Sequence, residues 1–319
     1  MHPIIIICGP TAVGKTSISI RLAQLLNTDI ISADSMQVYK NMDIGTAKPS
    51  RYEQSLITHY MIDVIEPWEY FSAGAYLEAV IPIIEQLKIR QKIPIITGGT
   101  GLYMKAITRG LFRGPSAVKE IRQRLMDSEK KEPGILHKKL TQIDEHTASR
   151  VNPNDIKRII RALEVWEITQ KTMGMLQKQE TVPLPYRFIK IGLTRHRDEI
   201  YRLINQRVDT MVSNGLFDEV SSVSQMILSV NPSDNPLEHL LGFTSMQAIG
   251  YKEILDYLYS DHKDRQKVVE KIKQRTRNYA KRQLTWFRGE TDITWVNLTD
   301  RAEDDIIEEI RWTISQRLI

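Results

Sequence analysis

The feature that most constrains the fold of this chain is a glycine-rich segment directly after a short apolar run near the N-terminus. Residues 4–8 are four isoleucines and a cysteine, a run typical of a strand buried on both faces of a sheet. The next segment, Gly9–Thr16, matches the pattern G-x-x-x-x-G-K-[ST] without a mismatch, and apolar residues at helical spacing follow over 16–26. A strand, such a loop and a helix in this order predict an α/β fold with a parallel sheet, whose ligands bind at the carboxyl ends of the strands.

The loop itself predicts a site for a polyphosphate ligand. Its glycines let the backbone wrap around a diphosphate, and the amides at the start of the following helix point towards the negative charge. Lys15 adds a cation, and the Thr16 hydroxyl is placed to bind a Mg²⁺ ion together with the diphosphate. We therefore expect the diphosphate to be bound by Gly9, Pro10, Thr11, Ala12, Val13, Gly14, Lys15 and Thr16. The pattern does not say which group the diphosphate carries.

The rest of the chain divides into a core that forms the sheet and a helical insertion. We predict further strands at 29–33, 93–97, 188–193 and 293–296, and core helices at 75–89, 198–213, 217–228, 245–259, 264–287 and 302–318. Between residue 115 and about residue 179 the strands disappear, and the pattern predicts helices at 118–128, 134–143 and 154–170. The expected organisation is a phosphate-loop core of residues 1–113 and 187–319, with a parallel sheet flanked by helices, and an all-helical insertion at 114–186.

Composition excludes several other classes of protein. A single cysteine, Cys8, allows neither a disulfide framework nor a thiolate zinc site, and the seven histidines have no metal-ligand spacing. No apolar run approaches the length of about 20 residues that a membrane-spanning helix needs, so we expect a cytoplasmic protein with no membrane segment. The net charge of +5 is mild, but nine of the Lys and Arg residues lie between 265 and 288 with a single acid.

Other polar segments have both a structural and a functional interpretation. Asp34 follows the second strand and could ligate a metal, act as a general base or cap the next helix. The segment Asp43–Lys48 is a surface turn or part of a site, and the glycines at 98–101 form a tight turn or let a ligand approach the backbone. The helical cations Lys157 and Arg161 could simply form a solvated face.

The basic segment near the C-terminus alternates cations with aromatic residues. Lysine and arginine neutralise the phosphates of a nucleic acid, and planar side chains stack on exposed bases. Trp286 and Phe287 are expected as core anchors with or without RNA. The pattern therefore indicates RNA contact through Arg277, Lys281 and Arg282, with a charged surface helix as the alternative.

Taken together, these segments resemble the bacterial tRNA dimethylallyltransferases, also called tRNA isopentenyltransferases of the IPP transferase family. Seven blocks carry the resemblance in the family's order and spacing, at residues 9–16, 34–39, 43–49, 98–103, 152–165, 248–251 and 279–287. The resemblance implies transfer of a dimethylallyl group from dimethylallyl diphosphate to N6 of adenosine 37, in tRNAs that read codons beginning with U. The products are N6-(dimethylallyl)adenosine and diphosphate, and the partners are the tRNA anticodon stem-loop and the prenyl diphosphate.

The resemblance also implies roles for individual residues. Asp34 would be the base near N6, Thr16 would assist Mg²⁺ and the diphosphate, and Arg207 would neutralise the leaving diphosphate. The helical insertion would grip the anticodon stem. The positions that match tRNA contacts of the family are Asp34, Ser35, Met36, Gln37, Thr100, Arg122, Lys157, Arg158, Ile159, Ile160, Arg161, Gln247, Ala248, Ile249, Gly250, Tyr251 and Lys252.

Three other functions fit part of the sequence. A small-molecule kinase would turn over ATP without RNA, an RNA-binding NTPase would hydrolyse a nucleotide, and a non-catalytic tRNA-binding protein would have no use for the phosphate loop. The blocks at 34–39 and 98–103 argue against all three. We expect a monomeric prenyltransferase, and the sequence leaves open whether its phosphate loop also binds ATP.

Overall fold

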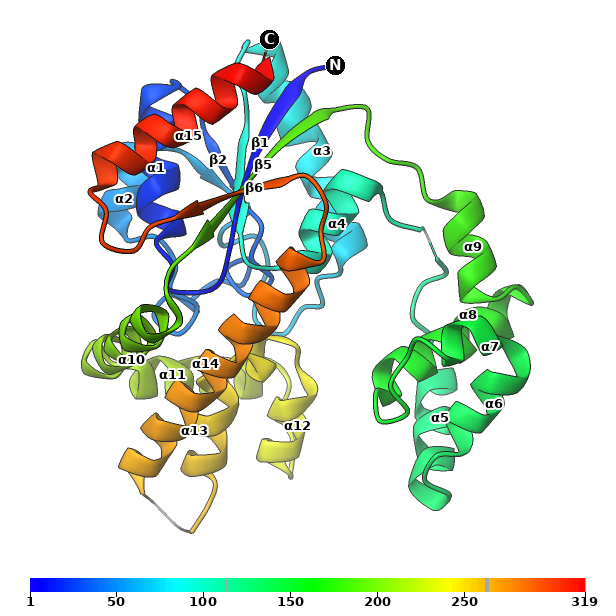
Figure 1. Cartoon of the computed structure of the whole chain (residues 1–319). Coiled ribbons are helices and arrows are strands. Elements are labelled where there is room, and N and C mark those ends of the chain that lie inside the picture. Colours follow the sequence, from blue (N-terminus) through cyan, green and yellow to red (C-terminus); the bar gives the residue numbers. More distant parts are fainter. Residues whose placement is uncertain (113, 262–263, 319) are drawn as a thin grey trace. The chain divides into compact units, whose positions relative to one another are not determined.

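The computed structural model describes residues 1–112, 114–261 and 264–318, which form two compact units. The core unit comprises Met1–Met104 and Pro185–Ile319, and the helical unit comprises Lys105–Leu184 (Figure 1). The helical unit thus begins nine residues before the expected position 114, because part of the helix α4 (Gly101–Arg109) is included in it. Residue 113, the expected end of the first core segment, lies outside the described residues.

The core unit is built on a six-stranded sheet whose strands are all parallel. The strands lie in the order β3-β2-β4-β1-β5-β6 and comprise β1 (Pro3–Cys8), β2 (Ile30–Ser32), β3 (His59–Tyr60), β4 (Ile95–Gly98), β5 (Arg187–Thr194) and β6 (Ile293–Asn297). Strand β1 pairs with β4 on one side and β5 on the other, as its unbroken apolar run predicts. The carboxyl ends of β1, β2 and β4 therefore lie at one edge, where the phosphate loop, Asp34 and the glycine turn follow them.

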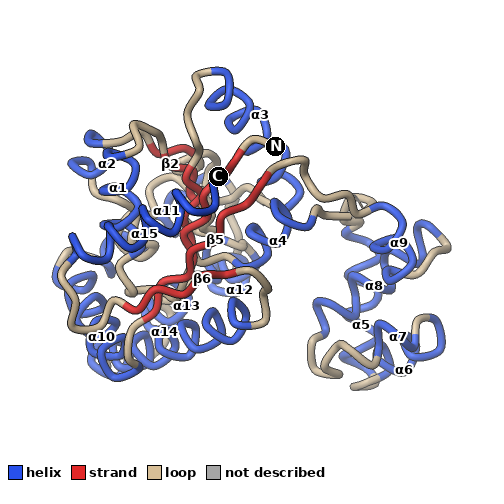
Figure 2. The backbone as a smooth tube through the Cα atoms, turned by 45° about the horizontal axis from the view of Figure 1, so that its top comes forward, coloured by secondary structure: helices blue, strands red, loops and turns tan. Residues whose placement is uncertain are grey.

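Helices cover both faces of this sheet, which confirms the predicted fold class (Figures 1 and 2). On one face, α1 (Lys15–Leu25) and α15 (Glu303–Leu318) bury apolar residues against Ile5 and Ile7. The other face is covered by α3 (Ala73–Ile89). A short helix, α2 (Arg51–Leu56), precedes β3, and its N-terminus has a capping box between Ser50 and Glu53.

A layer of helices lies beyond the carboxyl ends of the strands (Figure 1). It consists of α10 (Arg197–Ser213), α11 (Leu216–Val230), α12 (Pro236–Gly242), α13 (Tyr251–Leu258) and α14 (Arg265–Arg288), with a shared apolar core. The prediction of one helix at 245–259 is wrong in one respect. The structure divides this segment into a 3₁₀ turn, Ser245–Gln247, and α13. Gly250 interrupts it with a φ of 98°, a conformation that does not continue a right-handed helix.

In its described residues the helical unit contains α-helices and no strand, as the disappearance of the strand pattern predicts. After α4, its helices are α5 (Lys119–Lys131), α6 (Ile135–Ile143), α7 (Glu145–Ala148), α8 (Ile156–Thr169) and α9 (Met173–Glu180). They pack around a separate apolar core that includes Leu125, Leu140 and Leu163. Across the two units, none of the described helices is both long and apolar enough to cross a bilayer.

Candidate active site at the phosphate loop

The loop between β1 and α1 has the wrapped backbone that its sequence predicts. Gly9, Ala12 and Gly14 adopt φ values of 147°, 64° and 110°, so three positions within six residues lie in the left-handed region. At Gly9 a Cβ atom would lie 2.6 Å from the carbonyl oxygen of Leu193, a distance that no side chain tolerates. Glycine is therefore required here both for the φ angle and for the close packing of the loop against β5.

Lys15 lies inside the loop with its charge directed at the loop's own carbonyls. Its Nζ donates hydrogen bonds to the carbonyl oxygens of Gly9 at 3.0 Å and Pro10 at 2.8 Å. Desolvation, together with the positive charge of Arg207, lowers the pKa of Lys15 to about 8, although Asp34 acts in the opposite direction. A diphosphate bound in this loop would place negative charge beside Lys15 and so stabilise its charged ammonium form.

Arg207 reaches the same loop from α10. Its Nη1 lies 3.3 Å from the hydroxyl oxygen of Thr11, to which it donates a hydrogen bond. Desolvation lowers the pKa of the Arg207 guanidinium, which nevertheless stays a cation because arginine is effectively always protonated in proteins. The structure thus brings together two cations that lie 192 positions apart (207 − 15) in the sequence.

Asp34 lies after β2 and faces the cavity above the phosphate loop. Its Oδ1 accepts a hydrogen bond of 2.9 Å from the backbone N–H of Met36. Desolvation raises the pKa of Asp34, while the Met36 amide and Lys15 partly oppose the rise. Asp34 caps a turn and not a helix, since the next helix begins at Arg51; this removes one of its three sequence interpretations.

The turn after β4 supports the segment that contains Asp34. Thr100 accepts a hydrogen bond at 3.0 Å from the backbone N–H of Ser35 and also contacts its hydroxyl at 3.3 Å. At Gly98 a Cβ atom would lie 2.2 Å from the carbonyl oxygen of Ala33. The glycine turn therefore packs β4 closely against β2 and leads into α4. Gly98 also lines the cavity, so both interpretations of this segment stay open.

Gln283 is a cavity residue that the sequence analysis missed. Its Oε1 accepts a hydrogen bond from the Thr11 backbone N–H at 2.8 Å, and its Nε2 donates one to the Gly99 carbonyl at 2.9 Å. The side chain is only 6% exposed. The sequence signal that could have indicated this role is its position four residues after Tyr279, because helical spacing places both residues on one face of α14. Both residues line the cavity.

The side chains around this cavity come from seven separate parts of the core unit. The residues that line it are Thr11, Ala12, Gly14, Lys15, Thr16, Ser19, Ser32, Asp34, Gln37, Thr46, Ala47, Pro49, His59, Thr97, Gly98, Arg207, Tyr279 and Gln283. In the part of the chain that the structure describes, no group of three or more His, Cys, Asp or Glu residues could hold a metal ion. An ion at the Thr16 hydroxyl would therefore depend on oxygen atoms of the ligand for most of its coordination.

Several residues that we expected to contact tRNA are exposed cations or polar groups. Lys157 and Arg158 lie on the outer surface of α8, where Arg158 also pairs with Asp155 at 3.2 Å. Lys281 and Arg282 are exposed on α14, and Gln247 is exposed before α13. Arg277 is half-buried and donates a hydrogen bond of 2.6 Å to the side chain of Asn205.

Other expected tRNA contacts have side chains that are buried in protein, and their role toward tRNA stays a prediction. Ile159 and Ile160 are 0% and 5% exposed in the core of the helical unit, and Tyr251 and Ala248 are buried in the core formed by α10–α14. The buried Gly250 has no side chain and serves to start α13, while Met36 and Ile249 are half-buried against the same apolar core, and Lys252 is half-buried as well.

Arg122 and Arg161 are engaged within the helical unit. Both donate hydrogen bonds to Glu164, Arg122 at 2.8 and 2.9 Å and Arg161 at 2.6 Å. Burial raises the pKa of Glu164, and the bonds from the two arginines and the Val118 amide outweigh this effect and hold it below the ordinary value. Because Glu164 is 0% exposed, the first role of these arginines is to neutralise a buried carboxylate.

With this geometry established, comparisons with known proteins identify the family. Residues 37–290 match the family model described as IPP transferase. The chain belongs to this family. It is 49% identical to the tRNA dimethylallyltransferase of Thermodesulfovibrio yellowstonii, over 96% of this chain and 95% of that protein. It is 43% identical to the tRNA dimethylallyltransferase of Thermotoga maritima, over 97% and 96% of the two chains.

Solved structures agree with this membership of the IPP transferase family. The tRNA isopentenylpyrophosphate transferase of Bacillus halodurans superposes with a TM-score of 0.71 at 38% identity, covering 100% of this chain and 97% of that chain. A eukaryotic dimethylallyltransferase acting on tRNA superposes with a TM-score of 0.76 at 28% identity, covering 100% and 78%. The family resemblance inferred from the seven sequence blocks is confirmed.

Proposed function

We propose that this IPP transferase moves the dimethylallyl group of dimethylallyl diphosphate to N6 of adenosine 37, in tRNAs that read codons beginning with U. The observation that carries the proposal is the convergence of Lys15, Arg207 and Asp34 on one cavity. Two cations suit a leaving diphosphate, and a desolvated carboxylate suits a base for a weakly basic amine. Sequence identities of 49% and 43% to tRNA dimethylallyltransferases, over nearly the full length of the chain, support the same reaction.

The leaving group is the first half of the chemistry. As the bond between C1 of the prenyl group and the diphosphate oxygen breaks, negative charge grows on that oxygen. Lys15 and Arg207 line the cavity beside the wrapped loop, so their positive charges and the loop amides are close enough to stabilise this charge as it develops.

The acceptor is the second half. The N6 amine of adenine is a poor nucleophile because its lone pair is delocalised into the ring, so removal of a proton favours formation of the bond between N6 and C1. Asp34 accepts that proton, and its raised pKa makes it a stronger base than an ordinary aspartate. The adenine must leave the anticodon-loop stack to reach Asp34, at a cost of a few kcal/mol.

We also propose that Mg²⁺ accompanies the diphosphate. When bound, it neutralises diphosphate oxygens in the way that phosphate loops generally use it. The Thr16 hydroxyl lines the cavity and is a hard oxygen donor of the kind that Mg²⁺ prefers, so the residues fit this ion. Thr16 would hold the ion, and oxygen atoms of the diphosphate would complete its coordination.

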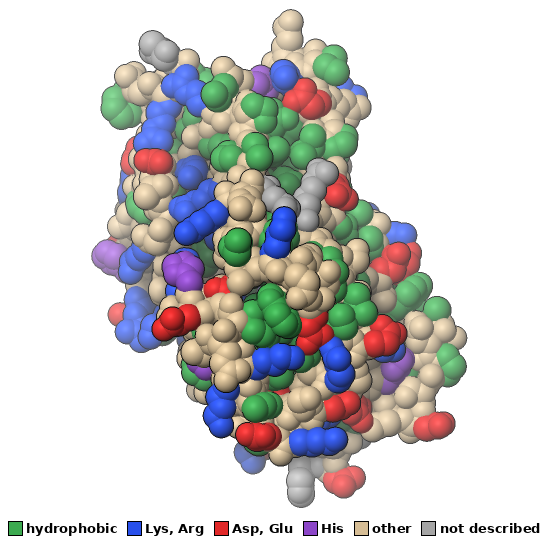
Figure 3. Space-filling view, turned by 90° about the vertical axis from the view of Figure 1, so that its right-hand side faces the viewer, with side chains coloured by type: hydrophobic (Ala, Val, Ile, Leu, Met, Phe, Trp, Pro, Cys, Tyr) green, Lys and Arg blue, Asp and Glu red, His purple; other side chains and the backbone are tan. Residues whose placement is uncertain are grey.

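The tRNA partner is bound by exposed cations in both units. In the helical unit these are Lys157 and Arg158, and in the core unit they are Lys281 and Arg282 of α14, where the Arg282 guanidinium lies 5.6 Å from the Tyr279 ring centre. Figure 3 shows Lys and Arg side chains exposed on the surface in view, with acidic side chains among them. We propose that the enzyme acts as a monomer in the cytoplasm.

The deciding experiment is mass spectrometry of the anticodon loop after incubation of the protein with tRNA, Mg²⁺ and dimethylallyl diphosphate. We expect a mass increase of one dimethylallyl group on adenosine 37 and none on a matched transcript with guanosine at that position. A kinase or an NTPase would instead consume ATP and leave the tRNA unmodified. That result would overturn the proposed function.

A further inference from the structure

The cations of the cavity suit the charged head of a prenyl diphosphate, but the apolar tail of the donor also needs a binding surface. Most of the side chains around the cavity are charged, amide or hydroxyl groups. Among the described lining residues, Ala12, Ala47 and Pro49 have side chains made only of hydrocarbon, and Ala12 belongs to the phosphate loop. Outside the phosphate loop, Ala47 and Pro49 are therefore the described lining residues whose purely hydrocarbon side chains are available to the tail.

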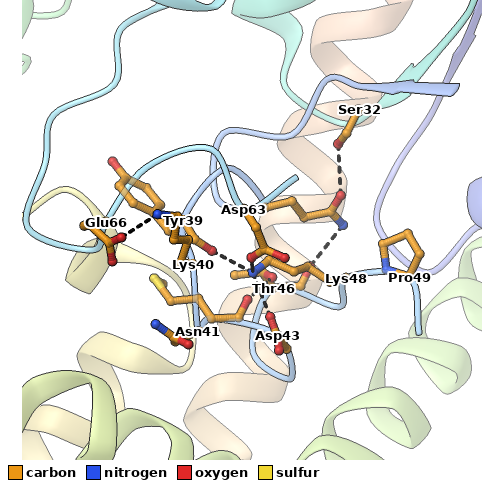
Figure 4. Close-up of polar contacts among 12 residues, drawn as sticks. Ser32, Tyr39, Lys40, Asn41, Asp43, Thr46, Lys48, Pro49, Asp63 and Glu66 are labelled. Carbon is orange, nitrogen blue, oxygen red and sulfur yellow. Dashed lines mark hydrogen bonds and ion pairs between the residues drawn. The ribbon is translucent and has the colours of Figure 1, made fainter. Parts of the chain in front are cut away.

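Both residues belong to the segment Asp43–Pro49, which we name the wall loop. It contains neither helix nor strand, yet side chains hold its backbone at several points (Figure 4). Gln37 donates hydrogen bonds from Nε2 to the carbonyls of Thr46 at 3.3 Å and Ala47 at 3.1 Å. Its Oε1 accepts one from the Ser32 hydroxyl at 2.9 Å, which fixes the wall loop to the end of β2.

Lys48 fixes the wall loop from within. Its side chain is 2% exposed, and Nζ donates to the Tyr39 carbonyl at 2.6 Å and to the carboxylates of Asp43 at 2.7 Å and Asp63 at 2.5 Å. All three ammonium protons thus have an acceptor. An ammonium group that is buried and fully satisfied holds its surroundings in one arrangement.

Glu219 of α11 fixes the other end of the wall loop. Its carboxylate accepts hydrogen bonds of 2.7–2.9 Å from the backbone N–H groups of Asp43, Ile44 and Gly45. It also accepts one of 2.6 Å from the hydroxyl of Tyr251, whose ring would lie 2.5 Å from a Cβ atom at Gly45. Held in this way, the wall cannot move back to admit a larger ligand without breaking several hydrogen bonds.

We propose that the wall loop is the subsite for the prenyl tail and that Ala47 limits the tail to five carbons. This inference rests on the proposed function, since it specifies how that active site selects its donor. Ala47 lines the cavity, and its φ of 51° lies in the left-handed region. Glycine adopts that conformation more easily than alanine, so Ala47→Gly enlarges the subsite by one methyl group without straining the backbone.

The test compares dimethylallyl diphosphate with its homologue that carries one more carbon, 3-methylpent-2-enyl diphosphate. For each donor, kcat/KM is measured with saturating tRNA. A single methylene in an apolar pocket changes selectivity by roughly 10- to 200-fold. We therefore expect Ala47→Gly to raise the ratio of kcat/KM for the homologue over dimethylallyl diphosphate by about tenfold or more.

Ala12→Gly is the matched control. Ala12 also lines the cavity with a positive φ of 64°, but it lies in the phosphate loop beside the diphosphate. This control can lower overall activity, but it should leave the ratio between the two donors unchanged. An unchanged ratio in Ala47→Gly, or an equal shift in Ala12→Gly, would overturn the subsite.

A second measurement separates the tail from the head of the donor. Binding of inorganic pyrophosphate, which has no tail, should have the same Kd in Ala47→Gly and in the unsubstituted chain. A loss of pyrophosphate binding in Ala47→Gly would place Ala47 at the head and overturn the proposal. Failure of the unsubstituted chain to prenylate tRNA would be a failure of the proposed function itself, so the two failures are distinguishable.

Discussion

Gln283 of α14 accepts a hydrogen bond at 2.8 Å from the backbone N–H of Thr11 in the phosphate loop. The same amide group donates to the carbonyl of Gly99, so one side chain joins the turns that follow β1 and β4. Gln283 shares its helix with the exposed cations Lys281 and Arg282. A shift of α14 on binding tRNA would therefore be transmitted to the diphosphate site.

This arrangement predicts that Gln283 couples the two substrates. Gln283→Met keeps the size of the side chain but leaves the Thr11 amide without its acceptor, at a cost on the order of 1–3 kcal/mol when the group is buried. We expect Gln283→Met to reduce the factor by which tRNA strengthens binding of dimethylallyl thiodiphosphate, an unreactive analogue. Calorimetric titrations with and without tRNA measure this factor.

Gln283→Glu provides the control for this prediction, because a carboxylate still accepts from Thr11 but cannot donate to Gly99. It should retain more of the coupling than Gln283→Met. If both variants keep the full effect of tRNA on analogue binding, the glutamine is a structural bridge without a part in coupling.

The difference between Gln283 and the phosphate loop shows what the sequence could and could not predict. The loop, its lysine and the strand before it are local patterns whose spacing is set by backbone geometry, and all were predicted close to their observed bounds. Gln283 acquires its role from a contact with a residue 184 positions away. Strand β3 was missed for a related reason, since two residues are too short to show a period.

Residues 157–161 were predicted as one tRNA-binding block, and the structure divides them by helical periodicity. Ile159 and Ile160 face the core with Leu163, whereas Lys157 and Arg158 face outward. The 3.6-residue period of α8 could have separated these two groups from the sequence alone. The role of Arg161 could not be separated in that way, because it depends on a pairing with Glu164 that Arg122 of α5 shares.

Lys157 and Arg158 are therefore the cations of α8 whose removal should weaken binding of tRNA. Replacing both with alanine should raise the Kd for tRNA and reduce the slope of log Kd against log salt by about one to two units, because up to two phosphate contacts are lost. Fluorescence anisotropy over a series of salt concentrations gives both quantities. Lys130→Ala with Lys131→Ala removes the same charge from exposed residues at the end of α5. An equal loss of affinity and slope in that control would exclude a specific tRNA surface on α8.

The lowered pKa of Lys15 predicts that binding of the donor depends on pH. In the free enzyme the ammonium loses its proton near pH 8, and a bound diphosphate stabilises the charged form and raises this pKa. The affinity for dimethylallyl diphosphate in the absence of tRNA should therefore be highest near pH 7, above the ionisation of the diphosphate and below that of Lys15. It should fall as pH rises above 8, with uptake of a proton on binding.

Calorimetry in buffers of different ionisation enthalpy measures that proton directly. The diphosphate itself ionises near pH 6, below the range in question. Lys15→Met should bind the donor more weakly and without this pH dependence. A constant affinity of the unsubstituted chain between pH 7 and pH 9.5 would show that Lys15 is fully protonated before the donor arrives.

Asp34 allows the most direct test of the chemistry, because its two remaining interpretations predict different results. Asp34→Asn preserves the shape of the side chain and its acceptor for the Met36 amide, but it removes the basic oxygen. If Asp34 takes the N6 proton, single-turnover transfer should fall by about 10²–10⁴-fold at saturating tRNA, with little change in tRNA affinity. In the unsubstituted chain, the raised pKa should place the acid limb of the rate profile above pH 3.8, since the rate grows as the carboxylate ionises.

A metal-ligand role predicts instead that raising Mg²⁺ restores the rate of Asp34→Asn. The measurement is transfer across a Mg²⁺ titration, and full recovery at high Mg²⁺, or a rate near that of the unsubstituted chain, would remove Asp34 from the role of base.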